Sequence, residues 1–111
     1  MTTNEAWFAA RLLFESKLPA DSEALFEERL VLIKSDSLDD AQKKAVKIGA
    51  SSGEEYKNIE GDTVAWTFKE VLDLVELTDI AIGDGSEVYH HFLKAEEVEA
   101  IRNSLKSGSL E

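Results

Sequence analysis

Apolar side chains occur at every second position near the start of this chain, and this spacing limits how the segment can fold. In AWFAARLLFE, residues 6–15, one parity carries only apolar side chains: Phe8, Ala10, Leu12 and Phe14. Successive side chains of a β-strand point to opposite faces, so the pattern predicts a strand with one wholly apolar face. Such a face needs a second layer of structure to cover it.

A second strand is predicted over residues 25–34, LFEERLVLIK, after a loop marked by Pro19. In a hairpin folded about position 20, the apolar face of the first strand meets the more apolar face of the second. The expected partners are Phe8 with Leu32, Ala10 with Leu30, Leu12 with Glu28, and Phe14 with Phe26. A slip of one residue would break this match. Arg11 would then lie opposite Arg29 on the other face, among ordinary cross-strand charge pairs.

A helix is predicted over residues 38–49, because its apolar side chains follow the spacing of one helical face: Leu38, Ala41, Ala45 and Ile48. Ser37 and Asp40 approximate a capping box at its start. Gly49 is typical of a residue that ends a helix. The two alanines suit a helix that lies close against a sheet.

The next segment predicts a hairpin, with residues 56–59 as one strand and a second strand that starts at Thr63. Gly61 supplies the positive φ that a tight turn needs. The run TVAWTFKEVLDLVEL, residues 63–77, has apolar side chains on both parities. This pattern predicts a long, bent or bulged strand that is covered on both sides near its far end. A helix over residues 69–77 is the alternative.

A turn at Asp84-Gly85 is expected to lead into one more strand, EVYHHFLK, residues 87–94. A helix is then expected over residues 95–106. Its apolar side chains lie along one side: Val98, Ile101 and Leu105.

The predicted order of elements is β-β-α-β-β-β-α. It indicates an α+β fold, with a mostly antiparallel sheet of about five strands and two short helices packed on it. A length of 111 residues predicts a single domain over residues 1–111. We expect an ordered core over residues 6–106 and a frayed tail over residues 107–111.

The charge balance restricts the partners of the chain. Twelve basic and 23 acidic residues give a formal net charge of −11, which argues against binding nucleic acid or a membrane surface, because Lys and Arg supply most of the affinity for phosphate. The simplest interpretation of the acidity is that it keeps the protein soluble. The alternative is that an acidic face binds a basic partner. The absence of cysteine excludes disulfides and thiolate metal sites. With no export signal or long apolar run in view, we expect a cytoplasmic protein.

Two kinds of side chain invite a chemical role. His90 and His91 are the only histidines, and neighbours in a strand point to opposite faces, so they cannot readily share one metal ion. Glu28 and Glu70 each interrupt an otherwise apolar strand face. Buried carboxylates with a raised pKa mark acid–base sites, whereas pairing with Arg or Lys is the structural alternative. We expect no catalytic residues, no metal and no other cofactor.

The predicted strands offer more apolar surface than two short helices can cover, which suggests self-association through a sheet face or edge. We therefore expect a small non-enzymatic interaction module, homodimeric or bound to another protein. Its candidate surface residues are Trp7, Glu28, Trp66, Glu70, Tyr89, His90 and His91. The alternatives are a small-ligand binder or enzyme that uses strand carboxylates, Tyr89 or a histidine in a sheet-lined pocket, and an immunity-type inhibitor of a basic partner.

Four segments of the chain resemble a known family, and they span most of the sequence from Trp7 to Leu93. They are WFAARLLFE, LFEERLVLIKSDSLDDAQKKAVKIG, YKNIEGDTVAWTFKEVLDLVEL and EVYHHFL. The most distinctive pieces are the G-D-T-x-x-W-x-F-x-x-V-x-D stretch, residues 61–73, and E-V-Y, residues 87–89. In these the chain resembles a bacterial domain-of-unknown-function family, DUF 4288. The resemblance implies one complete domain of similar size and carries over no activity and no catalytic residue.

Overall fold

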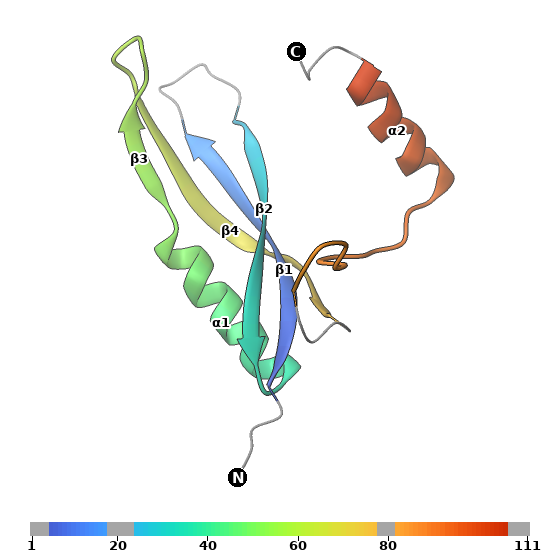
Figure 1. The fold of residues 1–111 in the computed structure, drawn as a ribbon. Helices are drawn as coiled ribbons and strands as arrows, with labels where there is room; N and C mark the ends of the chain where they lie inside the picture. The colour runs from blue at the N-terminus through green and yellow to red at the C-terminus, as the bar shows by residue number, and fades with distance from the viewer. Residues whose placement is uncertain (1–4, 18–23, 78–81, 107–111) are drawn as a thin grey trace.

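A curled antiparallel sheet with one helix inside its curl forms the centre of the molecule (Figure 1). The computed structural model describes residues 5–17, 24–77 and 82–106. The strands lie in the spatial order β2-β1-β4-β3. The elements along the chain are β1 (Ala6–Lys17), β2 (Phe26–Ser35), α1 (Leu38–Ser51), β3 (Glu54–Lys57), β4 (Thr63–Glu76) and α2 (Ala95–Lys106). The predicted α+β class is confirmed, with four strands in the described residues instead of about five.

The β1–β2 hairpin forms, but its register differs by one residue from the prediction. Phe8 lies opposite Ile33, Ala10 opposite Val31, Leu12 opposite Arg29 and Phe14 opposite Glu27. The predicted partners Leu30 and Leu32 instead point away from the core, and 53% and 40% of their surface is exposed. β2 is apolar on both parities, so either of its faces can meet the apolar face of β1. In the observed register the Arg29 guanidinium lies 3.9 Å from the centre of the Phe14 ring, so a cation covers this aromatic side chain.

Arg11 and Arg29 are therefore not opposite each other, as the predicted register had placed them. Arg11 pairs in register with Leu30, and Arg29 pairs with Leu12. The two arginines lie on opposite faces of the sheet. The loop predicted around Pro19 and the tail predicted to fray, residues 107–111, lie outside the described residues.

Helix α1 begins as predicted and packs against the inner face of the sheet. The Ser37 hydroxyl accepts a hydrogen bond from the Asp40 backbone N–H at 3.2 Å, which confirms the predicted cap. The helix ends at Ser51, so Gly49 is not its stop. Gly49 is buried in the last turn, where an added Cβ would lie 2.4 Å from a ring carbon of Phe68. Glycine there permits a close approach of helix to sheet.

Strand β4 is long and bulged, as its sequence predicts, and the helical alternative for its second half is wrong. Two register shifts against β1 leave Lys69 and Leu72 as extra residues of β4. Each bulge reverses the parity of the strand. Phe68, Val71 and Leu74 therefore all pack against the core, although their numbers do not share one parity.

The carboxy-terminal arm, which we define as residues 82–106, departs most from prediction. The turn at residues 83–86 is confirmed by Gly85 at φ 85° and by a 3.0 Å bond from the Ser86 N–H to the Gly83 carbonyl. The predicted strand over residues 87–94 is absent, because this segment leaves the sheet beyond β4 and Phe92 is 95% exposed. Helix α2 has the predicted bounds. Among the described residues, however, it contacts no other helix or strand, so only α1 packs on the sheet (Figure 1).

Candidate interaction surface

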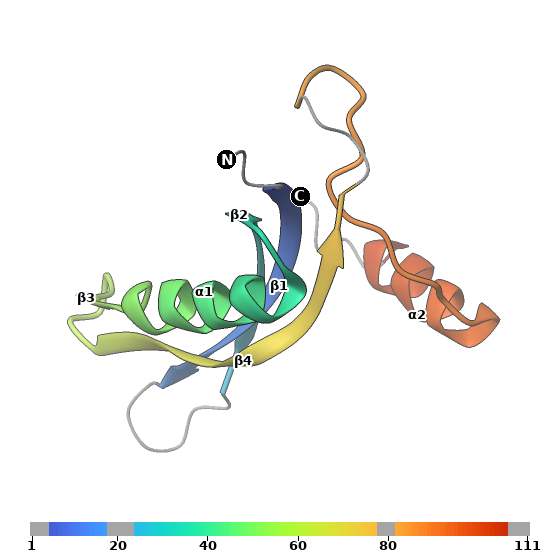
Figure 2. The same ribbon diagram turned by 90° about the horizontal axis from the view of Figure 1, so that it is seen from below.

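The face of the sheet opposite α1, which we call the outer face, carries the most exposed apolar side chains of the strands. The strand registers place its side chains in rows across β2, β1 and β4. The rows are Leu32, Ala9 and Val75; Leu30, Arg11 and Asp73; and Glu28, Leu13 and Glu70. Figure 2 shows α1 inside the curl of the sheet and α2 beyond its outer side.

Two polar contacts lie at the centre of the outer face. Arg11 forms an ion pair with Glu28, and this hydrogen bond raises the pKa of Arg11. The Tyr89 hydroxyl donates to Asp73 Oδ2 at 2.7 Å. That bond lowers the pKa of the Asp73 carboxyl, and desolvation, followed by the same bond, raises the pKa of Tyr89. The contacts satisfy these groups and fix the start of the arm to the sheet.

The two carboxylates singled out in the sequence are exposed. Glu28 follows the structural alternative, because it is ion-paired with Arg11 and 49% of its side chain is exposed. Glu70 is exposed in the same row of this face, on the other side of Leu13. Asp73, the carboxylate with a shifted pKa, was missed. Like Glu70, Asp73 is a charged residue between apolar residues. The bulge at Leu72 reverses the parity of β4, however, so the sequence pattern does not show on which face Asp73 lies.

The candidate residues of the arm divide into two groups. The rings of Tyr89 and His91 lie 5.2 Å apart beside the outer face. His90 Nδ1 instead lies 2.9 Å from Glu87 Oε1 within an exposed local pair. Within the described ranges, no group of three or more His, Asp or Glu side chains is arranged to hold a metal ion.

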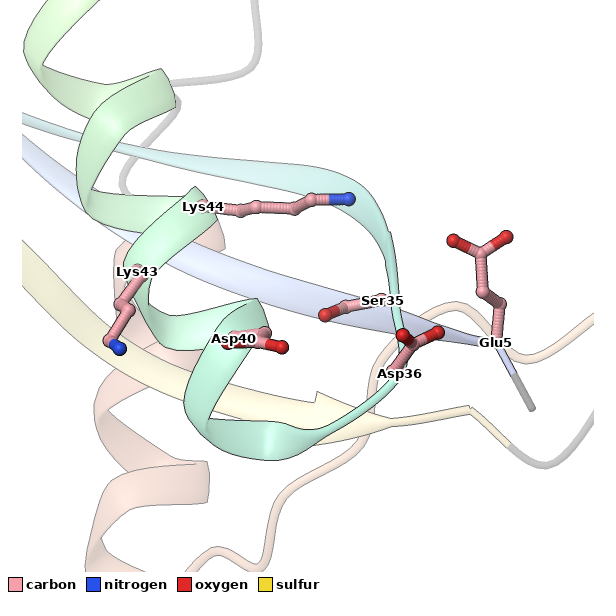
Figure 3. Close-up of a pocket in the computed structure, with 6 residues that line it drawn as sticks. All are labelled: Glu5, Ser35, Asp36, Asp40, Lys43 and Lys44. Carbon is pink, nitrogen blue, oxygen red and sulfur yellow. The ribbon is translucent and has the colours of Figure 1, made fainter. Parts of the chain in front are cut away.

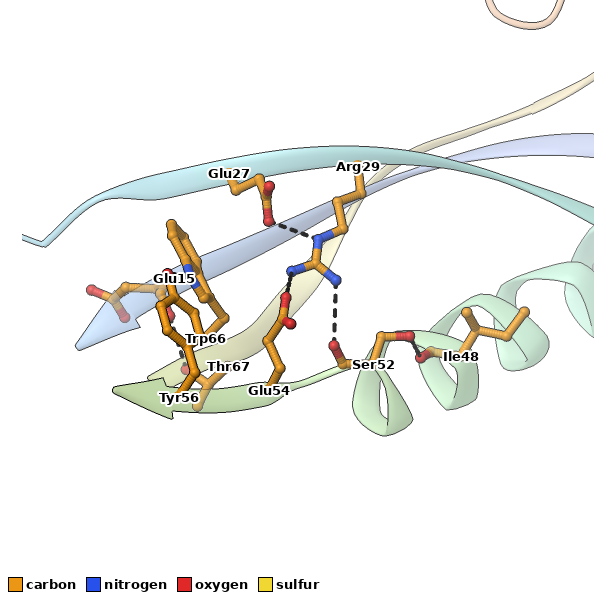
Figure 4. Close-up of polar contacts among 9 residues, drawn as sticks. All are labelled: Glu15, Glu27, Arg29, Ile48, Ser52, Glu54, Tyr56, Trp66 and Thr67. Carbon is orange, nitrogen blue, oxygen red and sulfur yellow. Dashed lines mark hydrogen bonds and ion pairs between the residues drawn. The ribbon is translucent and has the colours of Figure 1, made fainter. Parts of the chain in front are cut away.

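The two tryptophans lie on different faces of the sheet. Trp7 belongs to the outer face, where the Lys34 ammonium lies 5.6 Å from the centre of its ring. Trp66 lies on the inner face, and its Nε1–H donates to the Tyr56 hydroxyl at 3.4 Å (Figure 4). The structure thus brings Trp7, Glu28, Glu70, Tyr89 and His91 to one face and separates Trp66 and His90 from them.

Arg29 forms the main polar cluster of the inner face. Its guanidinium contacts Glu27 at 2.7 Å, Glu54 at 3.2 Å and the Ser52 carbonyl at 3.3 Å (Figure 4). These contacts tie β2 to β3 and to the end of α1, above the Phe14 ring. Arg29 therefore connects β2, β3 and the end of α1 on the inner face of the sheet.

A shallow hollow of about 260 Å³ lies beside the start of α1, away from the outer face (Figure 3). It is lined by charged and hydroxyl side chains: Glu5, Ser35, Asp36, Asp40, Lys43 and Lys44. The Lys44 ammonium donates to the Lys34 carbonyl at 2.5 Å. None of the seven candidate residues lines this hollow, so it does not gather them into a pocket.

These features define a small α+β protein in which α1 covers one face of the sheet, neither described helix covers the other, and α2 contacts no other described helix or strand. Residues 7–90 match the family model described as Domain of unknown function (DUF4288), and the chain belongs to this family. The matched range includes all of the sheet except Ala6, together with α1 and Tyr89, and α2 lies beyond it. No curated protein and no solved structure matches the chain. Neither described helix has the length and apolar character needed to cross a bilayer.

Proposed function

We propose that this chain is a small cytoplasmic, non-enzymatic interaction module that self-associates through the outer face of its sheet. The observation that carries the proposal is the exposure of Leu30 and Leu32, which lie near half-buried Trp7 on a face that neither described helix covers. A sheet is stable when both of its apolar faces meet another layer. Exposed apolar patches of this kind mark interaction sites.

The surface of the chain is large for its mass. It exposes 8374 Å², whereas a compact monomer of 12.3 kDa exposes about 6,100 Å². The radius of gyration is 17.2 Å, against about 13 Å for a compact chain of 111 residues. The difference, about 2,300 Å² per chain, exceeds the roughly 800 Å² that each partner buries in an interface of standard size. A second copy could cover this excess.

Light scattering of the full chain at micromolar concentration tests the proposal. We expect twice the mass of 12.3 kDa for the native chain, and a single-chain mass when Leu30→Glu and Leu32→Glu are combined. Because both leucines are exposed in one protomer, the variant should keep its circular dichroism spectrum.

The matched control is Leu38→Glu with Val46→Glu. These side chains, 56% and 44% exposed, belong to α1 on the other side of the sheet. The control adds the same charge and should remain dimeric. A native chain that stays monomeric at high concentration, or a control that dissociates as fully as the outer-face variant, would exclude the outer face as the interface.

A further inference from the structure

Helix α2 has an apolar side without a covering surface. It has 12 residues and contacts no other helix or strand of the described chain. Ile101 and Leu105, on its apolar side with Val98, are 49% and 50% exposed. Isolated helices shorter than about 12–15 residues are marginal in water, because packing of an apolar face supplies most helical stability. α2 therefore needs a surface to dock on.

Contacts within α2 and at its first residues stabilise the helix without the sheet. Glu97 Oε1 accepts a hydrogen bond from the Lys94 N–H at 2.9 Å, the return half of a capping box. Arg102 pairs with Glu99 at 3.1 Å, one turn away. Neither contact uses the apolar side of the helix. The helix is thus prepared for docking while that side stays open.

The base of the arm is fixed, but its helix stands away from its own sheet. Tyr89 is bonded to Asp73 on the outer face, and the chain then leads outward to α2 (Figures 1 and 2). One chain thus presents an apolar helix side and an apolar sheet face, and neither covers the other.

We propose that α2 of one copy docks on the outer face of a second copy, so that two chains exchange their α2 helices while the base of each arm stays on its own sheet. The inference rests on the proposed self-association and names the segment that mediates it. Each copy donates one helix and receives one, which closes a twofold dimer without leaving a free site.

The dimensions of the two surfaces agree. Twelve helical residues span about 18 Å. The rows of the outer face from Trp7 to Leu13 span seven residues of β1, or about 20 Å from the first to the last. One helix of this length therefore matches the extent of these rows, whose exposed apolar side chains are Leu30 and Leu32 on β2.

The charges at the ends of the two surfaces favour one orientation. On β2, Leu30 and Leu32 lie between Glu28 and Lys34 on the same face. The first turn of α2 is acidic, with Glu96 and Glu97, and Arg102 lies toward its other end. An α2 that runs antiparallel to β2 brings its acidic turn near Lys34 and Arg102 toward Glu28. Like charges would meet in the reverse orientation, at a cost in affinity.

Because the chain has no cysteine, single introduced thiols can report this contact. One preparation carries Leu30→Cys and the other, with a different tag, carries Ile101→Cys; they are mixed, left to exchange and treated with a short bis-maleimide. We expect covalent heterodimer at least about tenfold above the control pair Lys47→Cys with Ile101→Cys, because Lys47 lies on the exposed side of α1.

The outcomes separate this inference from the proposed function. A dimeric mass without the heterodimer crosslink leaves self-association standing and overturns the exchange of α2. Crosslinking of the Leu30→Cys/Ile101→Cys double variant only within one chain shows that α2 docks on its own sheet, which also overturns it. A monomeric mass overturns both.

A second variant tests α2 without a crosslinker. Ile101→Glu with Leu105→Glu should raise the dimer dissociation constant at least about tenfold, while the circular dichroism of the sheet stays unchanged. An unchanged dissociation constant would contradict the inference.

Discussion

Replacing Gly49 with alanine places a methyl group against the ring of Phe68. The added Cβ would lie 2.4, 2.5 and 2.8 Å from three ring carbons, whereas ordinary carbon–carbon contacts lie at about 3.5–4.0 Å. In an open helix interior the same change stabilises by about 1 kcal/mol, because alanine has the higher helix propensity. Overpacking of a core costs about 1–3 kcal/mol. The two effects therefore oppose each other at this position.

The Phe68 ring has little freedom to move aside. It packs edge-on against Phe14 with ring centroids 5.7 Å apart, and Phe14 is fully buried. With an overpacking cost of about 2 kcal/mol, Gly49→Ala should lower the free energy of unfolding by about 1 kcal/mol net. Urea unfolding followed by circular dichroism measures this. The monomeric Leu30→Glu/Leu32→Glu chain is the suitable background, because association would otherwise add to the apparent stability.

Phe68→Ala provides the internal control for this prediction. With the ring removed, Gly49→Ala should stabilise by up to about 1 kcal/mol, so the sign of its effect reverses. If Gly49→Ala stabilises both backgrounds equally, α1 does not approach β4 as closely as described, and the reasoning is refuted.

Three further predictions concern the two faces of the sheet. Leu12→Ala should cost about 2–5 kcal/mol in urea unfolding, whereas Leu30→Ala in a monomeric background should cost less than about 1 kcal/mol; equal costs would contradict the assignment of faces. Tyr89→Phe should cost about 1 kcal/mol or less at neutral pH. Its bond lowers the folded-state pKa of Asp73, so the contribution is present above the unfolded pKa of about 3.9 and is lost as the pH falls through the lower folded value. A difference in urea midpoint that does not shrink as the pH is lowered below the unfolded pKa would argue against this pair. Because each chain carries a formal charge of −11, added salt should strengthen the dimer in sedimentation equilibrium, and weakening would indicate an interface held by ion pairs.

Local patterns predicted the local features of the fold. The Ser37 cap, the bounds of α2 and the bulging of β4 depend on neighbouring residues, and the structure confirms them. The hairpin register brings Arg29 over the ring of Phe14, 15 residues away on a different strand, and a local pattern does not predict such a contact. The alternating pattern of residues 87–94 is typical of a strand. Strand propensity depends on packing within a sheet, however, and in the described structure this segment pairs with no strand.

The candidate surface was predictable only in part for similar reasons. Parity along a single strand brings Trp7 to the outer face, but the two bulges of β4 shift the face on which Asp73 and Glu70 fall. The helical stripe of Ile101 and Leu105 shows that α2 needs an apolar surface. Nothing in a single sequence states which chain supplies that surface.

The wrong hairpin register and the exposed outer face have the same cause in β2. This strand is apolar on both parities, with Val31 and Ile33 turned toward the core and Leu30 and Leu32 turned outward. Two apolar parities leave the register open to a parity argument, because either face fits the apolar face of β1. The same pattern is typical of a strand that is covered on both sides. In one chain α1 covers the inner side of β2 alone. The apolar residues on the other parity of β2 therefore indicate a second covering layer, and an exchanged α2 would provide it.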